Sequence, residues 1–264
     1  MRLAAALLML GAMSSAPAAL AATSPDAISY EYQNISARYE IQRDSSVKVE
    51  ERITISYEGT YHSLWRGVSV GSAAVSNVEV VDADTGEVLR QIKNFPDLPN
   101  DKQYYGTYAW INDDGYFKAQ WYYDAADTTK TWVLRYTLRG VVAFEADHDA
   151  LAWSLFSRYA VSVASSSVDV VLPAAAEIDG KLTSAPGRVL HPDPRTLRFE
   201  IEDIQPGGGV SFEARWPKGV VHPHVRGFFI TTLVLSYGIV PLVAALLLVC
   251  VAAGALVFKF KKRP

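Results

Sequence analysis

Two groups of acidic residues have the spacing closest to a metal site. The first consists of Glu145, Asp147, His148 and Asp149, and the second of Asp82, Asp84, Gly86 and Glu87. Carboxylates that alternate on a loop can supply oxygen ligands to Ca²⁺, but neither group has the twelve-residue frame of an EF-hand loop. Solvated loop acids are the simpler interpretation, so the sequence predicts no metal ion and no cofactor.

Catalytic motifs are largely absent. The chain has no H-E-x-x-H and no Walker loop. Ser154 follows His148 and Asp149 closely, but proximity in sequence is not the geometry of a catalytic triad. Carboxylate pairs suited to glycoside hydrolysis exist through abundance alone. We therefore expect a protein that is not an enzyme, with a glycan hydrolase as the least favoured alternative.

Glu51 is a charged residue at an apolar position. It lies between Val49 and Ile53 on the apolar side of an alternating segment, where an ionised carboxylate is costly unless it is paired. We predict an ion pair between Glu51 and Arg66. The favoured interpretation is a structural pair that fixes strand register, and the alternative is a ligand-binding or catalytic carboxylate.

Aromatic side chains are concentrated in the middle of the chain, between residues 110 and 132. Three consecutive members, Trp121, Tyr122 and Tyr123, cannot all point inward from one strand, because side chains alternate between the two faces. This segment is therefore the candidate binding surface, either for a partner protein or for a sugar that stacks on the rings.

Strict alternation of apolar and polar residues predicts the elements that position these side chains. Residues 35–41 and 47–57 alternate in this way and flank the turn residues Asp44, Ser45 and Ser46, which predicts a β-hairpin. Further strands are predicted at 78–81, 132–138, 168–172, 197–201 and 210–216, with a tight turn at 84–86. No stretch sustains a helical apolar pattern before residue 227. About ten to twelve short strands indicate an all-β fold, a β-sandwich.

Composition limits the partners of this region. Residues 22–226 contain 28 acidic and 20 basic residues, and this negative charge argues against nucleic acid or anionic lipid as ligands. The region has no cysteine, so core packing must stabilise it without disulfides.

Both ends of the chain have membrane-targeting features. Arg2, an apolar run and Ala19-Leu20-Ala21 are typical of a cleaved signal peptide. Residues 227–258 contain no Asp, Glu, Lys or Arg, which predicts one membrane-spanning helix, and the basic residues that follow it predict a cytoplasmic C-terminus. The predicted divisions are a signal peptide at 1–21, an extracytoplasmic domain at 22–218, a linker at 219–226, the span at 227–258 and a basic tail at 259–264.

Several short motifs, in this order, resemble a known family. They are YEI at 39–41, DSSVKVEERI at 44–53, WRGV at 65–68, YTLRGVV at 136–142, LAW at 151–153 and VDVVLP at 168–173. Together they resemble the predicted membrane proteins that carry domain of unknown function 2207. The turn of that family usually reads Asp-Gly-Ser where this chain has Asp44-Ser45-Ser46, and its Trp-Asn is Trp153-Ser154 here. The resemblance implies a β-rich extracytoplasmic domain on a membrane anchor, with no established catalytic activity.

The expected function follows from fold, anchor and missing chemistry. We expect a non-enzymatic protein of the bacterial cell envelope, held in the cytoplasmic membrane by a single span, whose β-sandwich lies in the periplasm and binds another envelope protein. The alternative is a module that binds carbohydrate or cell wall through Trp121, Tyr122 and Tyr123. Fold alone does not decide between them.

Overall fold

The computed structural model describes residues 29–97, 100–184 and 186–223. These residues form strands and loops without an α-helix, and the only helical turn among them is the 3₁₀ segment η1 (Lys102–Tyr104). The strands are β1 (Ser29–Ile41), β2 (Val47–Glu58), β3 (Thr60–Ser69), β4 (Ala74–Asp82), β5 (Glu87–Val88), β6 (Arg90–Gln91), β7 (Thr107–Asp113), β8 (Tyr116–Ala126), β9 (Thr129–Arg139), β10 (Ala143–Phe144), β11 (His148–Phe156), β12 (Val163–Val171), β13 (Asp179–Leu182), β14 (Arg188–Asp193), β15 (Thr196–Ile204) and β16 (Val210–Pro217). The predicted all-β class is confirmed, and all the predicted strands are present. The additional strands include pieces of only two residues.

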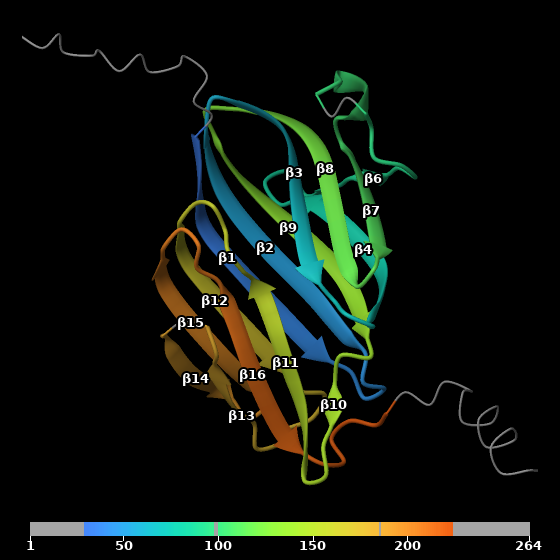
Figure 1. The fold of residues 1–264 in the computed structure, drawn as a ribbon, viewed down its shortest axis with the longest axis vertical. Coiled ribbons are helices and arrows are strands. Elements are labelled where there is room, and N and C mark those ends of the chain that lie inside the picture. Colours follow the sequence, from blue (N-terminus) through green and yellow to red (C-terminus); the bar gives the residue numbers. More distant parts are fainter. Residues whose placement is uncertain (1–28, 98–99, 185, 224–264) are drawn as a thin grey trace, which may run out of the picture.

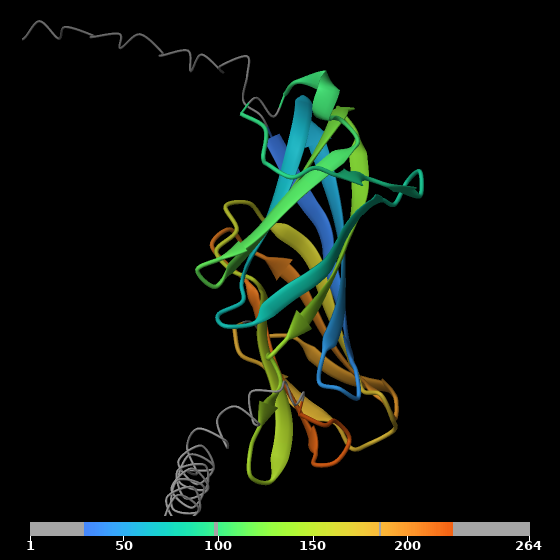
Figure 2. The ribbon, with the colours of Figure 1, turned by 90° about the vertical axis from the view of Figure 1, so that its right-hand side faces the viewer.

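Three open sheets make up the domain (Figure 1). The large sheet has eight strands in the order β14-β15-β12-β1-β2-β9-β4-β5. Two sheets of four strands face it: the upper sheet, β3-β8-β7-β6, and the lower sheet, β10-β11-β16-β13. Seen from the side, β8 and β11 lie on the same side of β1 and β2 (Figure 2). The domain therefore consists of one large sheet and two small sheets that lie on the same side of it.

The first hairpin forms the centre of the large sheet. β1 pairs antiparallel with β2 from Ser29↔Glu58 to Ile41↔Val47, and β2 also pairs with β9. Apolar residues of both strands point to one face and are buried, as the alternation predicts. β1 pairs on its other side with β12, and this pair is parallel. Strands from the two halves of the chain therefore meet at β1.

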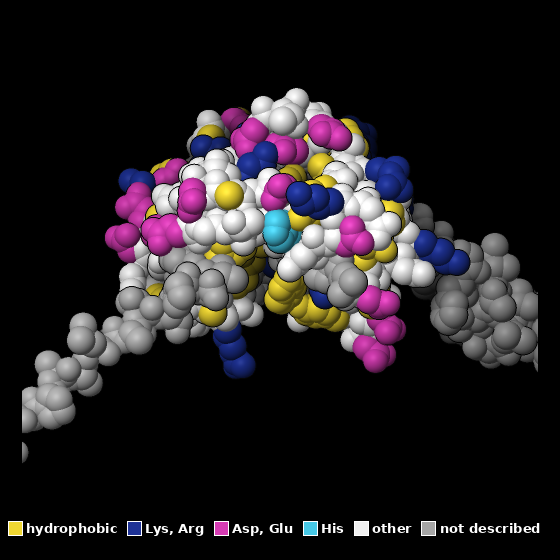
Figure 3. Space-filling view, turned by 90° about the horizontal axis from the view of Figure 1, so that it is seen from above, with side chains coloured by type: hydrophobic (Ala, Val, Ile, Leu, Met, Phe, Trp, Pro, Cys, Tyr) yellow, Lys and Arg dark blue, Asp and Glu magenta, His cyan; other side chains and the backbone are white. Residues whose placement is uncertain are grey.

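Ring packing between the layers forms the core. In the upper part, Trp121 of β8 lies 6.0 Å from Trp132 of β9, measured between ring centroids. In the lower part, Tyr39 of β1 lies 5.3 Å from Phe212 of β16. Acidic and basic side chains are interspersed on the end of the molecule seen in Figure 3, with apolar side chains visible between them. Burial of these rings provides the packing that a domain without disulfides requires.

The turn between β1 and β2 is held by the Asp44 carboxylate. Its Oδ1 accepts hydrogen bonds from the Ser46 amide (3.1 Å) and hydroxyl (2.5 Å), and its Oδ2 lies 3.1 Å from Nη1 of Arg139. The Ser46 hydroxyl, together with the Ser46 amide and Arg139, lowers the pKa of Asp44 from 3.8 to about 2. Ser45 adopts a φ of 60°, a left-handed conformation that glycine adopts with the least strain.

Replacing Asp44 by asparagine is expected to make the free energy of unfolding depend less on pH in the acid range. Because the folded pKa is depressed, the ionised carboxylate stabilises the fold above about pH 4, and that stabilisation is lost as the pH falls towards about 2. Urea unfolding at a series of pH values checks this. The wild-type protein should lose its advantage over Asp44→Asn across that interval, and a difference that stays constant with pH would contradict the assignment.

Candidate functional site

The predicted ion pair between Glu51 and Arg66 is present in the structure. Glu51 points inward from β2 and Arg66 points inward from β3, and their side chains are 0% and 2% exposed. Nε of Arg66 lies 2.5 Å from Oε2 of Glu51, and Nη2 lies 3.3 Å from Oε1. Two donors of one guanidinium thus face the two oxygens of one carboxylate, which is the strong, directional form of this interaction.

Arg66 also bonds to both small sheets. Its Nη1 donates to the carbonyl of Gly67 at 2.7 Å on β3, and its Nη2 donates to the carbonyl of Leu155 on β11. Leu155 lies where the register between β11 and β16 shifts, between Ser154 and Phe156. Such a bulge leaves a residue outside the ladder, so the guanidinium satisfies the Leu155 carbonyl. One buried side chain therefore connects the large, upper and lower sheets.

Tyr136 of β9 completes this buried group. Its hydroxyl donates to Oε1 of Glu51 at 2.6 Å. Burial raises the pKa of Tyr136 well above its ordinary value, and the Glu51 carboxylate raises it further. Burial alone would lower the pKa of Arg66, but the carboxylate of Glu51 raises it well above its ordinary range. Arg66 is therefore charged and Tyr136 neutral at every physiological pH, which is suited to a fixed structural role.

A cleft lies beside this group, where the edges of the upper and lower sheets face each other. Its volume is about 420 Å³, and it is bounded by β3 on one side and by residues 154–161, which join β11 to β12, on the other. Tyr30 and Tyr32 of β1 also line it. We call this space the inter-sheet cleft. Pockets of this size with aromatic walls and a few polar groups are typical small-ligand or peptide sites.

Two exposed aromatic side chains stand at the rim of the inter-sheet cleft. Trp65 is 56% exposed and Tyr116 is 41% exposed, and both line the cleft. Gly67 lies beside them, and a Cβ at this position would stand only 1.8 Å from the Tyr116 hydroxyl oxygen. A glycine at position 67 is thus what lets the Tyr116 ring lie against β3. Lys118 extends its ammonium 5.6 Å from the centre of the Trp65 ring.

The predicted binding surface at Trp121, Tyr122 and Tyr123 is wrong, because all three side chains are buried. Trp121 and Tyr123 point into the core, where both rings contact Trp132. Tyr122 points to the opposite face of β8, as the alternation requires. That face is covered at this position, since the ring of Tyr104 in η1 lies 6.3 Å from the ring of Tyr122. The prediction failed because a loop covers the outer side of the strand.

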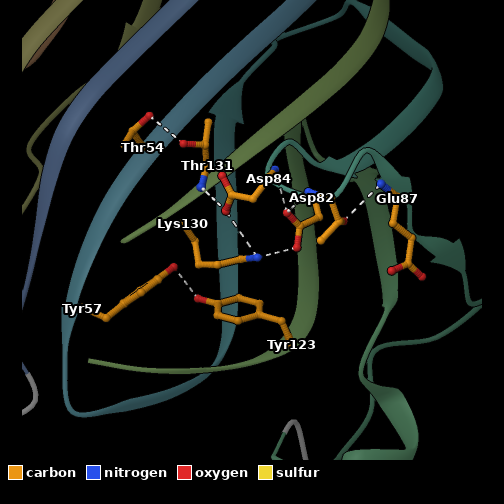
Figure 4. A network of polar contacts seen from close by, with 9 residues as sticks. Thr54, Tyr57, Asp82, Asp84, Glu87, Tyr123, Lys130 and Thr131 are labelled. Carbon is orange, nitrogen blue, oxygen red and sulfur yellow. Dashed lines mark hydrogen bonds and ion pairs between the residues drawn. The ribbon is translucent and has the colours of Figure 1, made fainter. Parts of the chain in front are cut away.

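Lysine side chains lie at both acidic groups considered as metal sites. Nζ of Lys130 lies 2.5 Å from Asp82 and 3.4 Å from Asp84 (Figure 4). Nζ of Lys218 lies 2.6 Å from the buried Asp149 carboxylate. In the part of the chain that the structure describes, no three side chains of His, Cys, Asp or Glu form a cluster that could hold a metal ion. At each group an ammonium lies beside the carboxylates that a cation would need.

The residue types of a Ser-His-Asp triad are not brought together. His148 begins β11 and Ser154 lies near its end, so the two are roughly 20 Å apart along the strand. His148 pairs instead with Asp147, and the Ser154 hydroxyl bonds to Ser211 and to the carbonyl of Phe156. These contacts are those of a surface strand rather than those of an activated nucleophile.

The predicted signal peptide and the predicted span at 227–258 lie outside the described residues. None of the described segments is a helix of the length and hydrophobicity that a bilayer crossing requires.

Comparisons with known proteins give a family and little beyond it. A family model described as the N-terminal domain of predicted membrane proteins, domain of unknown function 2207, matches residues 31–216. No match is found among curated proteins. Among solved structures, that of a candidate protease from Parabacteroides distasonis is 11% identical, with a TM-score of 0.39. The match covers 70% of this chain and 40% of the length of that one. The family match runs from within β1 to Trp216 of β16 and therefore includes every residue that lines the inter-sheet cleft except Tyr30.

Proposed function

The chain belongs to the family of predicted membrane proteins with domain of unknown function 2207, and on this premise we propose that it is a non-enzymatic binding module of the bacterial cell envelope. Its domain lies outside the cytoplasmic membrane, anchored by the C-terminal segment 227–258. Its ligand is another envelope protein, which it binds in the inter-sheet cleft. The carrying observation is a cleft with exposed aromatic side chains, two of whose lining residues, Gly67 and Leu155, are bound through their carbonyls by the buried Arg66.

The exposed aromatic rings support a binding role for the cleft. Trp65 and Tyr116 are among the few large apolar side chains with substantial exposure in the described residues, and they lie together at the rim. Aromatic side chains provide large contact area at low conformational cost, and they dominate the energetics of many interfaces.

The lining of the cleft favours binding over catalysis. Arg158 is the only charged side chain among the residues that line it, and no carboxylate, histidine or cysteine is present there. Of the side chains that commonly act as general acid or base, the lining thus has only tyrosines. A carbohydrate ligand is the second candidate, because Trp65 and Tyr116 are exposed rings on which a sugar can stack.

Chemical crosslinking in cells tests the proposal. The full-length chain with both Trp65→Ala and Tyr116→Ala is compared with the wild-type chain and with Val88→Ala, which removes an equally exposed side chain far from the cleft. We expect a protein partner to be recovered with the wild-type and Val88→Ala chains and to fall at least tenfold with the double variant. Equal recovery from all three chains would refute a binding role for the cleft.

A further inference from the structure

The last described residues of the chain still pack against the domain after β16 ends. Val221 is 3% exposed and belongs to the core, and Val220 packs against the core beside it. The amide of His222 donates to the carbonyl of Arg43, in the turn between β1 and β2, at 2.9 Å. This part of the predicted linker is therefore held by the domain.

Lys218 fixes the beginning of the same segment. Its Nζ lies 2.6 Å from Oδ1 of Asp149, whose side chain is 1% exposed, and it donates to the carbonyl of Glu145 at 2.7 Å. The same ammonium lies 5.5 Å from the centre of the Phe144 ring, which is within the range of a cation–π interaction. Lys218 therefore ties the segment after β16 to β10 and β11 of the lower sheet.

These contacts gather three segments at one end of the molecule, beside β10 in Figure 1. We call residues 42–46, 143–148 and 218–222 the lower end. The turn between β2 and β3 lies at the opposite end, because β2 runs from the first turn to the second. At about 3.4 Å per residue, the twelve residues of β2 separate the two ends by roughly 37 Å.

A short connection joins the lower end to the predicted membrane span. Only residues 223–226 separate His222 from the segment 227–258, which contains no charged residue. Because an extended chain covers at most about 3.6 Å per residue, this connection reaches at most about 18 Å. That reach is roughly half of the length of β2. With 227–258 as the anchor, the lower end is therefore the part of the domain that lies next to the bilayer.

The lower end presents an aromatic ring and charges of both signs to that bilayer. Phe144 is 38% exposed, and residues 145–147 of the turn after β10 are exposed. Anionic lipids attract clusters of Lys and Arg, whereas neither sign of charge dominates at the lower end. Zwitterionic headgroups, which carry a phosphate and an amine, fit such a surface better. The exposed charged residues of the lower end are Arg43, Asp44, Glu145, Asp147 and Lys218.

We propose that the lower end rests on the outer surface of the membrane, with the Phe144 ring among the headgroups of zwitterionic lipids. The inference rests on the proposed function for the anchor at 227–258 and adds a lipid contact to it. Aromatic side chains favour this interfacial region. The contact fixes the orientation of the domain, so that the upper sheet points away from the membrane and the inter-sheet cleft stays accessible to a protein.

Quenching of a fluorophore by labelled lipids tests this contact. The full-length chain with Cys250→Ala, which removes its only cysteine, receives the fluorophore at Ala146→Cys in the turn after β10. Ala126→Cys is the matched control, because this exposed alanine pairs with Thr60 at the opposite end of the domain. In phosphatidylcholine nanodiscs with nitroxide on some headgroups, we expect quenching at position 146 to exceed that at position 126 at least about threefold. Equal quenching would overturn the contact.

A second pair of variants tests the aromatic ring. Phe144→Ser is expected to reduce the quenching at position 146 at least about twofold, whereas Val88→Ser, at an exposed position of β5, should leave it unchanged. No difference between these variants would overturn the role of the ring. A chain that fails to enter nanodiscs would overturn the anchor together with this inference. Crosslinking in cells tests the binding role of the cleft separately, so that role can stand when the lipid contact fails.

Discussion

Replacing Arg66 by methionine is expected to lower the free energy of unfolding by about 3–5 kcal/mol, because it leaves the Glu51 carboxylate buried without its charged partner. The substitution also removes the donors to the carbonyls of Gly67 and Leu155, and an unsatisfied buried acceptor is itself costly. Urea unfolding followed by tryptophan fluorescence measures the loss.

Two comparisons isolate the buried pair. Arg135→Met breaks ion pairs with Glu50 and Glu79 on the half-exposed opposite face of the large sheet, and it should cost less than about 1 kcal/mol. The double variant Glu51→Met with Arg66→Met removes both buried charges and should recover part of the loss. Recovery should be incomplete because Tyr136 and the two carbonyls still lack partners. A loss in Arg66→Met no larger than that in Arg135→Met would contradict the role assigned to Arg66.

Trp121→Ala is expected to lower the free energy of unfolding by about 3–5 kcal/mol, since the indole is fully buried between the upper and large sheets. The missing indole would leave a cavity beside the ring of Trp132. Because that ring also packs against Tyr123, it cannot easily move to fill the cavity. Far-ultraviolet circular dichroism during urea unfolding is the suitable measurement, because the substitution itself changes the fluorescence.

Trp65→Ala is the matched control for Trp121→Ala. The same side chain is removed, but from a position that is 56% exposed, and the stability should change by less than about 0.5 kcal/mol. The two variants should therefore affect different properties: Trp121→Ala lowers the free energy of unfolding, and Trp65→Ala lowers the affinity for the proposed partner. Similar stability of the two variants would mean that Trp121 is not a core residue.

Sequence reasoning succeeded where the signal is local. A charged residue at an apolar position of a long alternating segment identified Glu51, and the partner predicted for it, Arg66, is the one that the structure shows. Turn residues between two alternating runs were sufficient for the hairpin of β1 and β2, because both its register and its buried face follow from a period of two residues.

The cleft depends on contacts between distant segments, and therefore the sequence did not reveal it. Its walls come from β1, β3, the start of β8, and the end of β11 with the residues that follow it, and no local pattern brings these together. The prediction of a binding surface in the aromatic segment was wrong for the same reason. Alternation correctly places Tyr122 on the outer face of β8, but it gives no sign of the Tyr104 ring that covers Tyr122. The exposed Trp65 and the glycine two residues later were the available signal, since glycine in a strand often marks a close approach.

Arg66 connects the two small sheets next to the inter-sheet cleft. It connects the edges of the two small sheets through their carbonyls, at the place where a continuous sheet would have had backbone pairing. The edge strands β3 and β11 are thus connected at one point, and the inter-sheet cleft lies beside it. Gly67 and Leu155, whose carbonyls Arg66 binds, both line the cleft. In the function that we propose, such preorganisation would reduce the entropic cost of binding.

The most direct test of a binding role for the cleft is photo-crosslinking from within it. A benzophenone amino acid at Ser157, an exposed residue of the cleft wall, is compared in cells with the same group at Val189, an exposed residue of β14. We expect one envelope protein to be crosslinked from position 157 of the full-length chain and none from position 189. The same products from both positions, or none from position 157, would contradict that role.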